Sequence, residues 1–403
     1  MTDVTALGEL LIDFTENGIS EQGNPILEAN PGGAPCNVLA MLTKLGNQTS
    51  FIGKVGNDSL GKMLKEKVTA LGIDTKYLYQ DEKVHTTLAF VHTAEDGDRE
   101  FSFYRNPGAD MMLRAEEVNE EAIKESKIFH FGTLSMTHEG VRAATKKAVE
   151  TAKENQVLIS FDPNLREPLW DSLDEARKQV SYGMSMCDVL KISDNEIEWY
   201  TGESDYTKAV EKILEDYQIP LILVSMGKQG SRAYYKNQMV EVPAVLQKNT
   251  IETTGAGDTF DACVLDYILK HGLENLSEQN LKEMLTFANA VASIVTTRKG
   301  ALCVMPSKED VEEISHKIYA NVLTLMGILV SVFGLLTINY QAFQKAEITA
   351  HFILVMNLTL ALSIVILMGI ILVLVNKARD KKFLWTYIII LILLAVATGI
   401  ACA

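Results

Sequence analysis

The nine residues Glu252-Thr-Thr-Gly-Ala-Gly-Asp-Thr-Phe260 constrain the fold and chemistry of this chain more than any other segment. An acidic residue and two threonines precede Gly255-Ala-Gly257, and Asp258 precedes an apolar run of helical length, Phe260–Leu269. Small residues let the backbone approach a ligand closely, and glycine accepts dihedral angles that other residues avoid. We therefore predict a turn leading into a helix whose N-terminus faces a bound anion.

Asp258 adds a base to this predicted anion site. A carboxylate beside an anion can take a proton from a hydroxyl group, and phosphoryl transfer to an alcohol requires both features. The alternative is that Asp258 only caps the helix, which is a common role for aspartate. The segment alone leaves both interpretations open, and the rest of the chain decides between them.

Length, charge and cysteine content limit the classes of protein to consider. A chain of 403 residues holds one large domain with an appendage, or two domains. The formal net charge of −15 disfavours nucleic acid as a partner. The five cysteines show neither metal-ligand spacing nor a disulfide framework, which fits a reducing compartment.

The composition changes sharply near Lys317, where three long apolar runs begin. Runs of this length are typical of membrane-spanning helices. We predict a domain at 1–317, followed by an all-α transmembrane segment at 318–403. The spans are expected at 322–338, 352–375 and 383–403.

The links between these runs predict an orientation. The link 376–382 contains four basic residues, whereas the link 339–351 contains one. Basic loops stay in the cytoplasm. We therefore expect residues 1–317 to be a cytoplasmic domain anchored in the lipid bilayer of the cell membrane, with the C-terminus outside.

Residues 1–317 alternate between strand-like and helix-like segments, which predicts a parallel sheet covered by helices on both faces, a three-layer α/β/α domain. Strands are expected at Thr5–Ile12, Ser50–Val55, Ile128–Phe131, Val157–Phe161, Val189–Ile192 and Leu221–Val224. Helices are expected at Ala34–Leu45, Leu60–Leu71, Glu139–Asn155, Leu173–Met184, Phe260–Leu269 and Ser277–Thr297.

Two features stand outside this alternation. The β-rich segments Val84–Thr93 and Arg99–Tyr104 flank a hairpin signal, and we assign them to a small β lid at about 10–30 and 84–108. Asp13 follows the predicted strand Thr5–Ile12 directly. Ligands of open α/β sheets bind beyond the carboxyl ends of strands, so Asp13 is a candidate for binding hydroxyl groups.

Further motifs follow one another along the chain. They are Asn30-Pro-Gly-Gly-Ala-Pro-Cys-Asn37, Phe51-Ile-Gly-Lys-Val-Gly-Asn-Asp58, Arg105-Asn-Pro-Gly-Ala-Asp110, Phe161-Asp-Pro-Asn-Leu-Arg166 and Lys191-Ile-Ser-Asp-Asn-Glu196. Together with the nine-residue segment, they resemble the signatures of the PfkB, or ribokinase, family of carbohydrate kinases, especially its bacterial fructokinase-like subgroup. The resemblance covers about residues 3–310 and implies a ribokinase-like fold that uses ATP and Mg²⁺. The chain departs from the family at Glu252, where Asp is usual, and at Ser193, which replaces an Asn.

The resemblance implies roles for individual residues. Asp258 would be the catalytic base, beside an anion hole formed by Gly255, Ala256 and Gly257. Sugar binding would involve Asp13, Gly32, Gly33, Asn37 and Arg105. ATP binding would involve Asn164, Arg166, Lys191, Ser225, Gly227, Gly230 and Asn289. Glu196 would help to organise Mg²⁺ indirectly, and the Lys299-Gly-Ala301 loop resembles the surroundings of a monovalent-cation site, such as one for K⁺.

The resemblance favours an ATP-dependent kinase that converts fructose to fructose 6-phosphate. One alternative is 2-keto-3-deoxygluconate kinase, because Arg105 and Arg166 would suit an anionic sugar acid. A second alternative is a kinase-like ligand sensor coupled to a membrane effector, which the three apolar runs motivate. Similar kinases commonly form dimers through the lid, so a homodimer is also expected.

Overall fold

The computed structural model describes residues 2–93 and 99–316, together with scattered positions between 318 and 396. The chain divides into two compact units, Met1–Lys308 and Glu309–Ala403, which we consider separately. The three predicted spans lie outside the described residues, apart from isolated positions in each. Within the described part of the chain, none of the helices combines the length and the apolar character needed to cross a membrane.

The first unit is built around a nine-stranded sheet in the order β13-β12-β11-β10-β9-β8-β1-β4-β5. The strands span Thr2–Leu7 (β1), Thr49–Gly56 (β4), Asp74–Asp81 (β5), Ser126–Gly132 (β8), Leu158–Asp162 (β9), Val189–Ser193 (β10), Leu221–Ser225 (β11), Ser231–Tyr235 (β12) and Gln238–Val242 (β13). Neighbouring strands from β11 to β5 pair in parallel, as the alternation predicted. The edge hairpin β12-β13 is antiparallel, which the sequence did not indicate.

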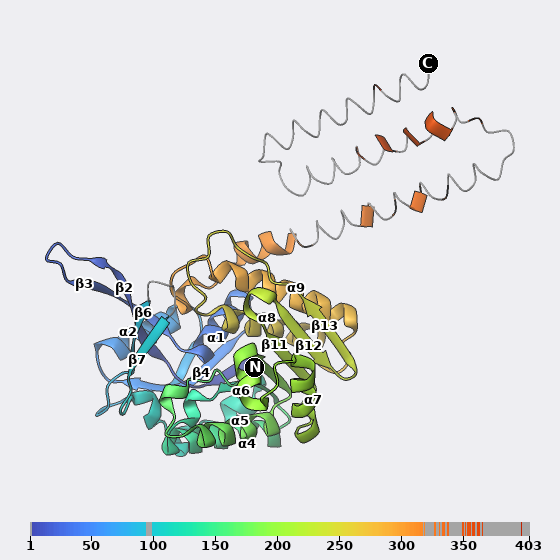
Figure 1. The fold of residues 1–403 in the computed structure, drawn as a ribbon. Coiled ribbons are helices and arrows are strands. Elements are labelled where there is room, and N and C mark those ends of the chain that lie inside the picture. Colours follow the sequence, from blue (N-terminus) through green and yellow to red (C-terminus); the bar gives the residue numbers. More distant parts are fainter. Residues whose placement is uncertain are drawn as a thin grey trace. The chain divides into compact units, whose positions relative to one another are not determined.

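Helices cover both faces of this sheet (Figure 1). They span Ala34–Lys44 (α1), Ser59–Ala70 (α2), Glu120–Lys124 (α3), Glu139–Glu154 (α4), Leu173–Met186 (α5), Asp194–Thr201 (α6), Tyr206–Asp216 (α7), Ala256–His271 (α8) and Glu278–Val295 (α9). The helices α1, α8 and α9 pack together on one face, and α4 to α7 lie on the other. The predicted helices are all present, whereas α3, α6 and α7 were not predicted.

A separate four-stranded sheet has the order β3-β2-β6-β7. Its strands span Leu11–Ile19 (β2), Pro25–Gly32 (β3), Leu88–Thr93 (β6) and Arg99–Tyr104 (β7), and they come from the two segments assigned to a lid. The β2-β3 hairpin projects away from the body of the unit (Figure 1). Its outer end is exposed to solvent, and Ile19 has 68% of its surface accessible. We call this four-stranded sheet the lid sheet and the nine-stranded one the main sheet.

The segment Thr5–Ile12, predicted as one strand, is divided between the two sheets. The strand β1 ends at Leu7 in the main sheet, and β2 begins at Leu11 in the lid sheet. Gly8 packs so closely against Pro35 that a side chain would not fit there, and the chain turns at this point. Hydropathy does not reveal the break, because the residues on both sides of it are buried.

This division corrects the predicted position of Asp13. The residue lies within β2, paired with Asn30 of β3, and not beyond the end of a main-sheet strand. The lid sheet therefore carries Asp13, whereas α8 carries Asp258 on the main body of the unit.

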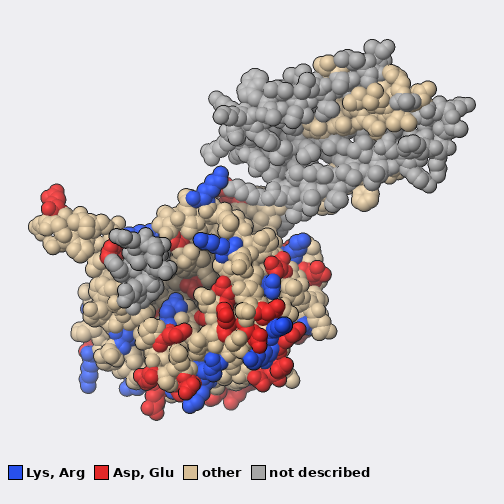
Figure 2. Space-filling view, in the orientation of Figure 1, with Lys and Arg blue, Asp and Glu red and all other residues tan. Residues whose placement is uncertain are grey.

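Charged side chains of both signs are interspersed over the visible face of the first unit (Figure 2). Some of them form exposed ion pairs within helices, such as Lys124 with Glu120 and Glu121. Exposed pairs of this kind contribute little to stability. The charges that matter for the chemistry are buried.

Candidate active site

The start of α8 is built to receive an anion. Gly255 occupies the N-cap with φ of 78°, a left-handed conformation that glycine adopts without strain. A side chain at Gly255 would lie 3.1 Å from Cβ of Ala301, so the neighbouring loop also requires a glycine. Among the described residues, no side chain caps this N-terminus, unlike those of α5, α7 and α9. The positive end of the helix dipole is thus left for a ligand.

Asp258 lies in the first turn of α8 and contacts α1. The amide Nδ2 of Asn37 donates a hydrogen bond to Oδ2 of Asp258 at 2.7 Å. Burial raises the pKa of Asp258 above its ordinary value, although the Asn37 bond and the charges of Lys191 and Arg166 oppose the shift. A carboxylate with a raised pKa is a stronger base, which suits proton abstraction from a hydroxyl group.

The other side-chain atom of Asn37 points to a missing partner. Its Oδ1 is buried and has no hydrogen-bond partner among the described residues. A buried acceptor without a donor costs free energy, so such atoms usually face a ligand or a water molecule. A hydroxyl group beside Asp258 would supply the donor.

Lys191 brings a positive charge to the same place. It lies on β10, it is only 6% exposed, and its Nζ donates to Oδ2 of Asp162 at 2.8 Å. A Cβ atom on Gly257 would be 3.2 Å from Nζ of Lys191, so the ammonium group lies directly beside the anion-binding turn. A larger residue at position 257 would push this ammonium group away from the turn.

Neighbouring carboxylates keep Lys191 charged. Burial would lower the pKa of Lys191, but Asp162, Glu196 and Asp258 outweigh burial and raise it. Burial raises the pKa of Asp162 to about 6, although Lys191 opposes the shift. The pair is ionised above that pH, and its ammonium group can stabilise negative charge at the start of α8.

A cavity of about 340 Å³ opens beside Lys191. It is lined by four residues predicted to bind ATP or Mg²⁺, namely Asn164, Arg166, Lys191 and Glu196, and by Trp199. Arginine and lysine are the side chains that bind phosphate groups most often. The structure thus brings these four predicted residues together around one polar cavity.

Glu196 also has a structural role at the start of α6. Its Oε2 accepts hydrogen bonds from N and Oγ of Ser193, and its Oε1 accepts one from N of Leu165. Among the described residues, no group of three His, Cys, Asp or Glu side chains could hold a metal ion. Mg²⁺ retains much of its water and relies on substrate phosphates, so an indirect role for Glu196 remains compatible with this geometry.

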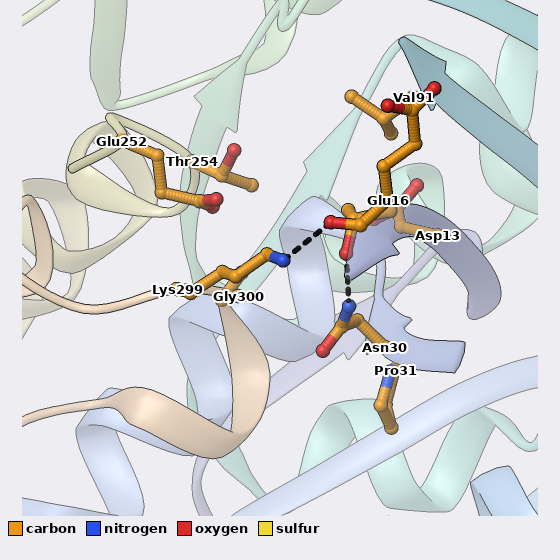
Figure 3. Close-up of a pocket in the computed structure, with 11 residues that line it drawn as sticks. Asp13, Glu16, Asn30, Pro31, Val91, Glu252, Thr254, Lys299 and Gly300 are labelled. Atoms are coloured by element: carbon orange, nitrogen blue, oxygen red, sulfur yellow. Dashed lines mark hydrogen bonds between the residues drawn. The ribbon is translucent and has the colours of Figure 1, made fainter. Parts of the chain in front are cut away.

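A smaller cavity of about 60 Å³ lies between the lid sheet and the loop after α9 (Figure 3). Asp13 and Asn30 line it from the lid sheet, and Glu252, Thr254 and the Lys299–Ala301 loop line it from the body. The Nζ of Lys299 donates to the carbonyl oxygen of Glu16 at 2.6 Å, and Asn30 donates to Oγ1 of Thr15 at 2.9 Å (Figure 3). The loop predicted near a cation site therefore contacts the lid sheet directly.

Two predicted sugar-binding residues are in contact within the lid sheet. A Cβ atom on Gly32 would overlap Oδ2 of Asp13, so glycine alone leaves room for this carboxylate. Gly33 has φ of 132° and precedes α1, which carries Asn37. The structure thus links Asp13 on β2 through Gly32 and Gly33 at the end of β3 to Asn37 on α1.

Arg105 differs from the other predicted sugar-binding residues. It is 6% exposed, and each of its three nitrogens donates inside the protein. Its Nε bonds to Asp110 at 2.8 Å, Nη1 bonds to Thr137 at 2.8 Å, and Nη2 bonds to the carbonyl oxygen of Leu134 at 2.9 Å. It lines neither of the two cavities described above. Arg105 therefore joins the segment that follows β7 of the lid sheet to residues in the body of the unit.

The remaining predicted ATP-binding residues do not line the larger cavity. Ser225 ends β11 and pairs with Ser193, while Gly227 and Gly230 form the following turn. Asn289 on α9 accepts a hydrogen bond from Ser231 at 3.0 Å and donates to the carbonyl oxygen of Val242 at 3.1 Å. Its amide therefore ties α9 to the β12-β13 hairpin.

Sequence reasoning missed two buried carboxylates of the site. Asp162 lies inside the quoted segment Phe161–Arg166, and Glu9 lies inside Gly8–Asp13, yet neither was assigned a role. Both were overlooked because a strand-like apolar run around an acidic residue does not show what its carboxylate contacts. An acidic residue within an apolar run indicates a carboxylate with a specific partner, since unpaired carboxylates are rarely buried.

Comparison with known proteins agrees with this geometry. The model of the pfkB family of carbohydrate kinases matches residues 1–308. Fructokinase-1 of Zea mays is 40% identical over 316 residues, which cover 78% of this chain and 98% of that protein. Among solved structures, fructokinase from Xylella fastidiosa with bound ATP is 26% identical with a TM-score of 0.72, covering 79% of this chain and all of that one. A double mutant of fructokinase from Vibrio cholerae O395, bound to fructose, ADP and potassium ion, is 28% identical with a TM-score of 0.71, covering 78% of this chain and 98% of that one.

Proposed function

The chain belongs to the pfkB family of carbohydrate kinases, and we propose that it transfers the terminal phosphoryl group of ATP to a primary hydroxyl of fructose. The enzyme class follows from the family, and the sugar is the part that we propose. The observation that carries the proposal is the position of Asp258, which lies in the first turn of an uncapped helix, beside the ammonium group of Lys191.

Each reacting group has a residue to act on it. Asp258 takes the proton from the attacking hydroxyl group, and Asn37 holds the carboxylate in place through its 2.7 Å hydrogen bond. The backbone of Gly255–Gly257 and the ammonium group of Lys191 stabilise the negative charge on the transferred group. Arg166 and Lys191 bind the nucleotide phosphates in the larger cavity. A bound Mg²⁺ would neutralise charge on those phosphates, with Glu196 acting on it through water.

The proposed sugar lies between the lid sheet and Asp258. Asp13 accepts hydrogen bonds from two hydroxyl groups, and the unpartnered Oδ1 of Asn37 accepts a third. The lid sheet excludes water, which otherwise competes with the sugar as the phosphoryl acceptor. The names of the relatives support fructose as this sugar, since the Zea mays and Vibrio cholerae proteins are both called fructokinases.

The structure disfavours the alternative substrate 2-keto-3-deoxygluconate. That alternative depended on Arg105 and Arg166 binding a sugar carboxylate. All three nitrogens of Arg105 are already engaged by Asp110, Thr137 and Leu134. Releasing them would leave Asp110 buried without its positively charged partner, which is costly.

The experiment that tests the proposal measures ADP release by the full-length protein with Mg-ATP and each of four acceptors: fructose, 2-keto-3-deoxygluconate, ribose and adenosine. We expect turnover with fructose that disappears in Asp258→Ala. Turnover with another acceptor would replace fructose as the substrate. A folded protein that binds ATP and fructose without turning over would favour the sensor hypothesis instead.

We also propose that the kinase unit is held at the cytoplasmic face of the membrane by residues 318–403. This proposal rests on the three apolar runs and the basic link 376–382 in the sequence. Extraction of membranes at alkaline pH tests it: an integral protein stays in the pellet, whereas a protein of residues 1–317 is released. Release of the full-length protein would remove the anchor from the proposal.

The predicted homodimer through the lid sheet likewise stays a proposal. The lid sheet exposes apolar side chains at Ile19, Ile26, Leu27 and Tyr104. Light scattering of the purified protein gives its mass, and a monomer at micromolar concentration would exclude this dimer.

A further inference from the structure

Glu9 occupies an unusual place between the two sheets. It lies in the three-residue connection from β1 of the main sheet to β2 of the lid sheet, and it is only 3% exposed. Buried carboxylates are rare unless they have partners. The mechanism described above does not use this group, so its burial requires another explanation.

The carboxylate of Glu9 holds the start of α1. Its Oε1 accepts a hydrogen bond from the backbone N–H of Ala34 at 2.9 Å. The N-cap of α1 is Gly33, which has no side chain of its own to accept this bond. The Glu9 carboxylate therefore accepts a hydrogen bond from the first turn of α1, as the N-cap residue Asp58 does for α2. Asp58 directly precedes its helix, whereas Glu9 comes from a different part of the chain.

The backbone of Glu9 contacts the same residue. A Cβ atom on Gly33 would overlap the carbonyl oxygen of Glu9, so the two chain segments approach as closely as glycine permits. Glu9 thus fixes Gly33 through its backbone and Ala34 through its side chain. Gly32 and Gly33 are the residues expected to lie against the sugar, and Asn37 follows in the next turn of α1.

All four chain connections between the two sheets meet near this point. Glu9 lies in the first connection, Ala34 lies in the second, Thr87 lies in the third, and Arg105 begins the fourth. Thr87 donates through Oγ1 to Oδ1 of Asp110, and Arg105 bonds to Oδ2 of the same carboxylate. Arg105 then continues into the body through Thr137 and Leu134. We call the set Glu9, Ala34, Thr87, Arg105 and Asp110 the hinge cluster.

We propose that Glu9 is a positioning residue for sugar binding, whose buried carboxylate holds Gly32, Gly33 and the start of α1 in the arrangement that receives the sugar. This inference rests on the proposed function, because it assumes that the sugar lies at these glycines. The ionised carboxylate holds α1 most firmly, since a charge-assisted hydrogen bond at a helix N-terminus is stronger than a neutral one.

The surroundings of Glu9 place its pKa within the pH range in which kinetics can be measured. Burial raises the pKa of Glu9 to about 7, the hydrogen bonds from backbone N–H groups lower it, the charge of Asp110 raises it, and the charge of Arg105 lowers it. Cys36 of α1 also faces this carboxylate, and burial together with Glu9 keeps its thiol protonated by raising its pKa. The carboxylate is therefore charged above about pH 7 and neutral below it, so its hold on α1 weakens as the pH falls.

The decisive experiment compares the fructose KM of Glu9→Gln with that of the wild type from pH 5.5 to 8.5. The glutamine retains an acceptor oxygen for Ala34 but carries no charge. The ratio of the two KM values cancels the titration of Asp258, which is common to both proteins. We expect a ratio near one at pH 5.5 that rises to roughly fivefold at pH 8.5, with kcat and the KM for ATP within about twofold.

Asp205→Asn is the matched control. Asp205 caps α7 by accepting hydrogen bonds from N of Thr207 and N of Lys208, on the face of the main sheet away from α1. This variant removes one helix-capping charge without touching the hinge cluster, and we expect a KM ratio of one at every pH. A ratio for Glu9→Gln that is one throughout, or raised equally at every pH, would overturn the proposal.

A second measurement does not depend on activity. Backbone amide exchange of residues 30–37 at pH 8 should be faster in Glu9→Gln than in the wild type, and unchanged in Asp205→Asn. Unchanged exchange in Glu9→Gln would refute the positioning role. Failure of the proposed function would show differently, as a wild-type protein without fructose turnover.

Discussion

The main sheet and the lid sheet differ in how completely the protein surrounds them. Every residue of β4 in the main sheet is buried, whereas most of β2 and β3 is partly or fully exposed. Helices cover both faces of the main sheet, and it carries the charged groups Asp162 and Lys191. The lid sheet carries Asp13 at its inner end. The groups proposed to act on the phosphoryl group thus lie on the enclosed body of the unit, and the groups proposed to select the sugar lie on the more exposed lid sheet.

The largest expected effect concerns the body of the unit and is the loss of kcat when Asp258 on α8 is replaced. We expect Asp258→Asn to lower kcat about a thousandfold, because loss of a general base typically costs 10²- to 10⁴-fold. The fructose KM should change much less. Asp266→Asn is the control, since Asp266 lies two turns further along α8 and bonds to Asn47 away from the site. Steady-state kinetics measure both, and an Asp258→Asn enzyme with near-normal kcat would remove Asp258 from the mechanism.

Lys191→Met should lower kcat about a hundredfold, because a single charged donor at a developing negative charge contributes roughly that much. The variant also leaves Asp162 buried without its partner, so its melting temperature should fall. The double variant Lys191→Met with Asp162→Asn separates the two effects. It should regain stability without regaining kcat, whereas recovery of both would show that Lys191 acts only through folding.

Gly32→Ala tests the sugar-binding end of the lid sheet. The added methyl group overlaps Oδ2 of Asp13, so the carboxylate must move. We expect the fructose KM to rise about thirtyfold, the loss of one to two hydrogen bonds to a charged group, while the KM for ATP stays constant. Gly140→Ala is the matched control, because the nearest atom to its new methyl group is 3.6 Å away. Equal effects of the two substitutions would contradict a role for Gly32 in sugar binding.

The pH profile of kcat at saturating fructose tests the burial of Asp258, because Glu9 is expected to change KM and not kcat. Burial raises its pKa, and the base must be deprotonated to act, so activity should fall as the pH drops through this raised value. We expect the acid limb above the ordinary aspartate pKa of 3.8, with a slope of about tenfold per pH unit. A limb at or below that ordinary value would mean that solvent reaches the carboxylate freely.

The smallest expected effect is a change in stability, and it compares Ile19 of the lid sheet with Ile222 of the main sheet. Ile19 in the lid sheet is 68% exposed, and Ile222 in β11 is fully buried. We expect Ile19→Thr to change the free energy of unfolding by less than about 0.5 kcal/mol and kcat by less than twofold. Ile222→Thr buries a hydroxyl group and should cost about 1–3 kcal/mol. Urea unfolding measures both, and equal costs would show that the lid sheet is as tightly packed as the main sheet.

The sequence predicts most of the main sheet and its helices, because the patterns that indicate them lie within short stretches of the chain. The apolar runs of β8 to β11 and the helices between them follow one another in the chain, and their alternation indicates a parallel sheet. The Gly255–Asp258 turn is equally local, since glycine, aspartate and the helix are contiguous. The structure places Asp258 at the start of that helix, with Asn37 hydrogen-bonded to it.

The sequence locates the two lid segments, but it does not show the hinge cluster or the break between β1 and β2, because the contacts that define them are distant in the chain. Nothing in Gly8–Asp13 shows that the chain leaves one sheet and enters another. The turn depends on Pro35, and the carboxylate of Glu9 finds its partner at Ala34. The resemblance implied that Arg105 contacts the sugar, and this stays a prediction. Its contacts with Thr137 and Leu134, some thirty residues later, could not be predicted from the sequence.

The way the lid sheet is assembled limits how related enzymes can be recombined. The strands β2 and β3 precede α1, β6 and β7 follow β5, and the two halves join through the parallel pair of β2 with β6. A chimera with one crossover between residues 33 and 87 would take each half of this sheet from a different parent. Its β2-β6 seam would then depend on how well the parents match. Exchange of sugar preference by gene shuffling therefore requires crossovers outside residues 11–104, so that both halves move together.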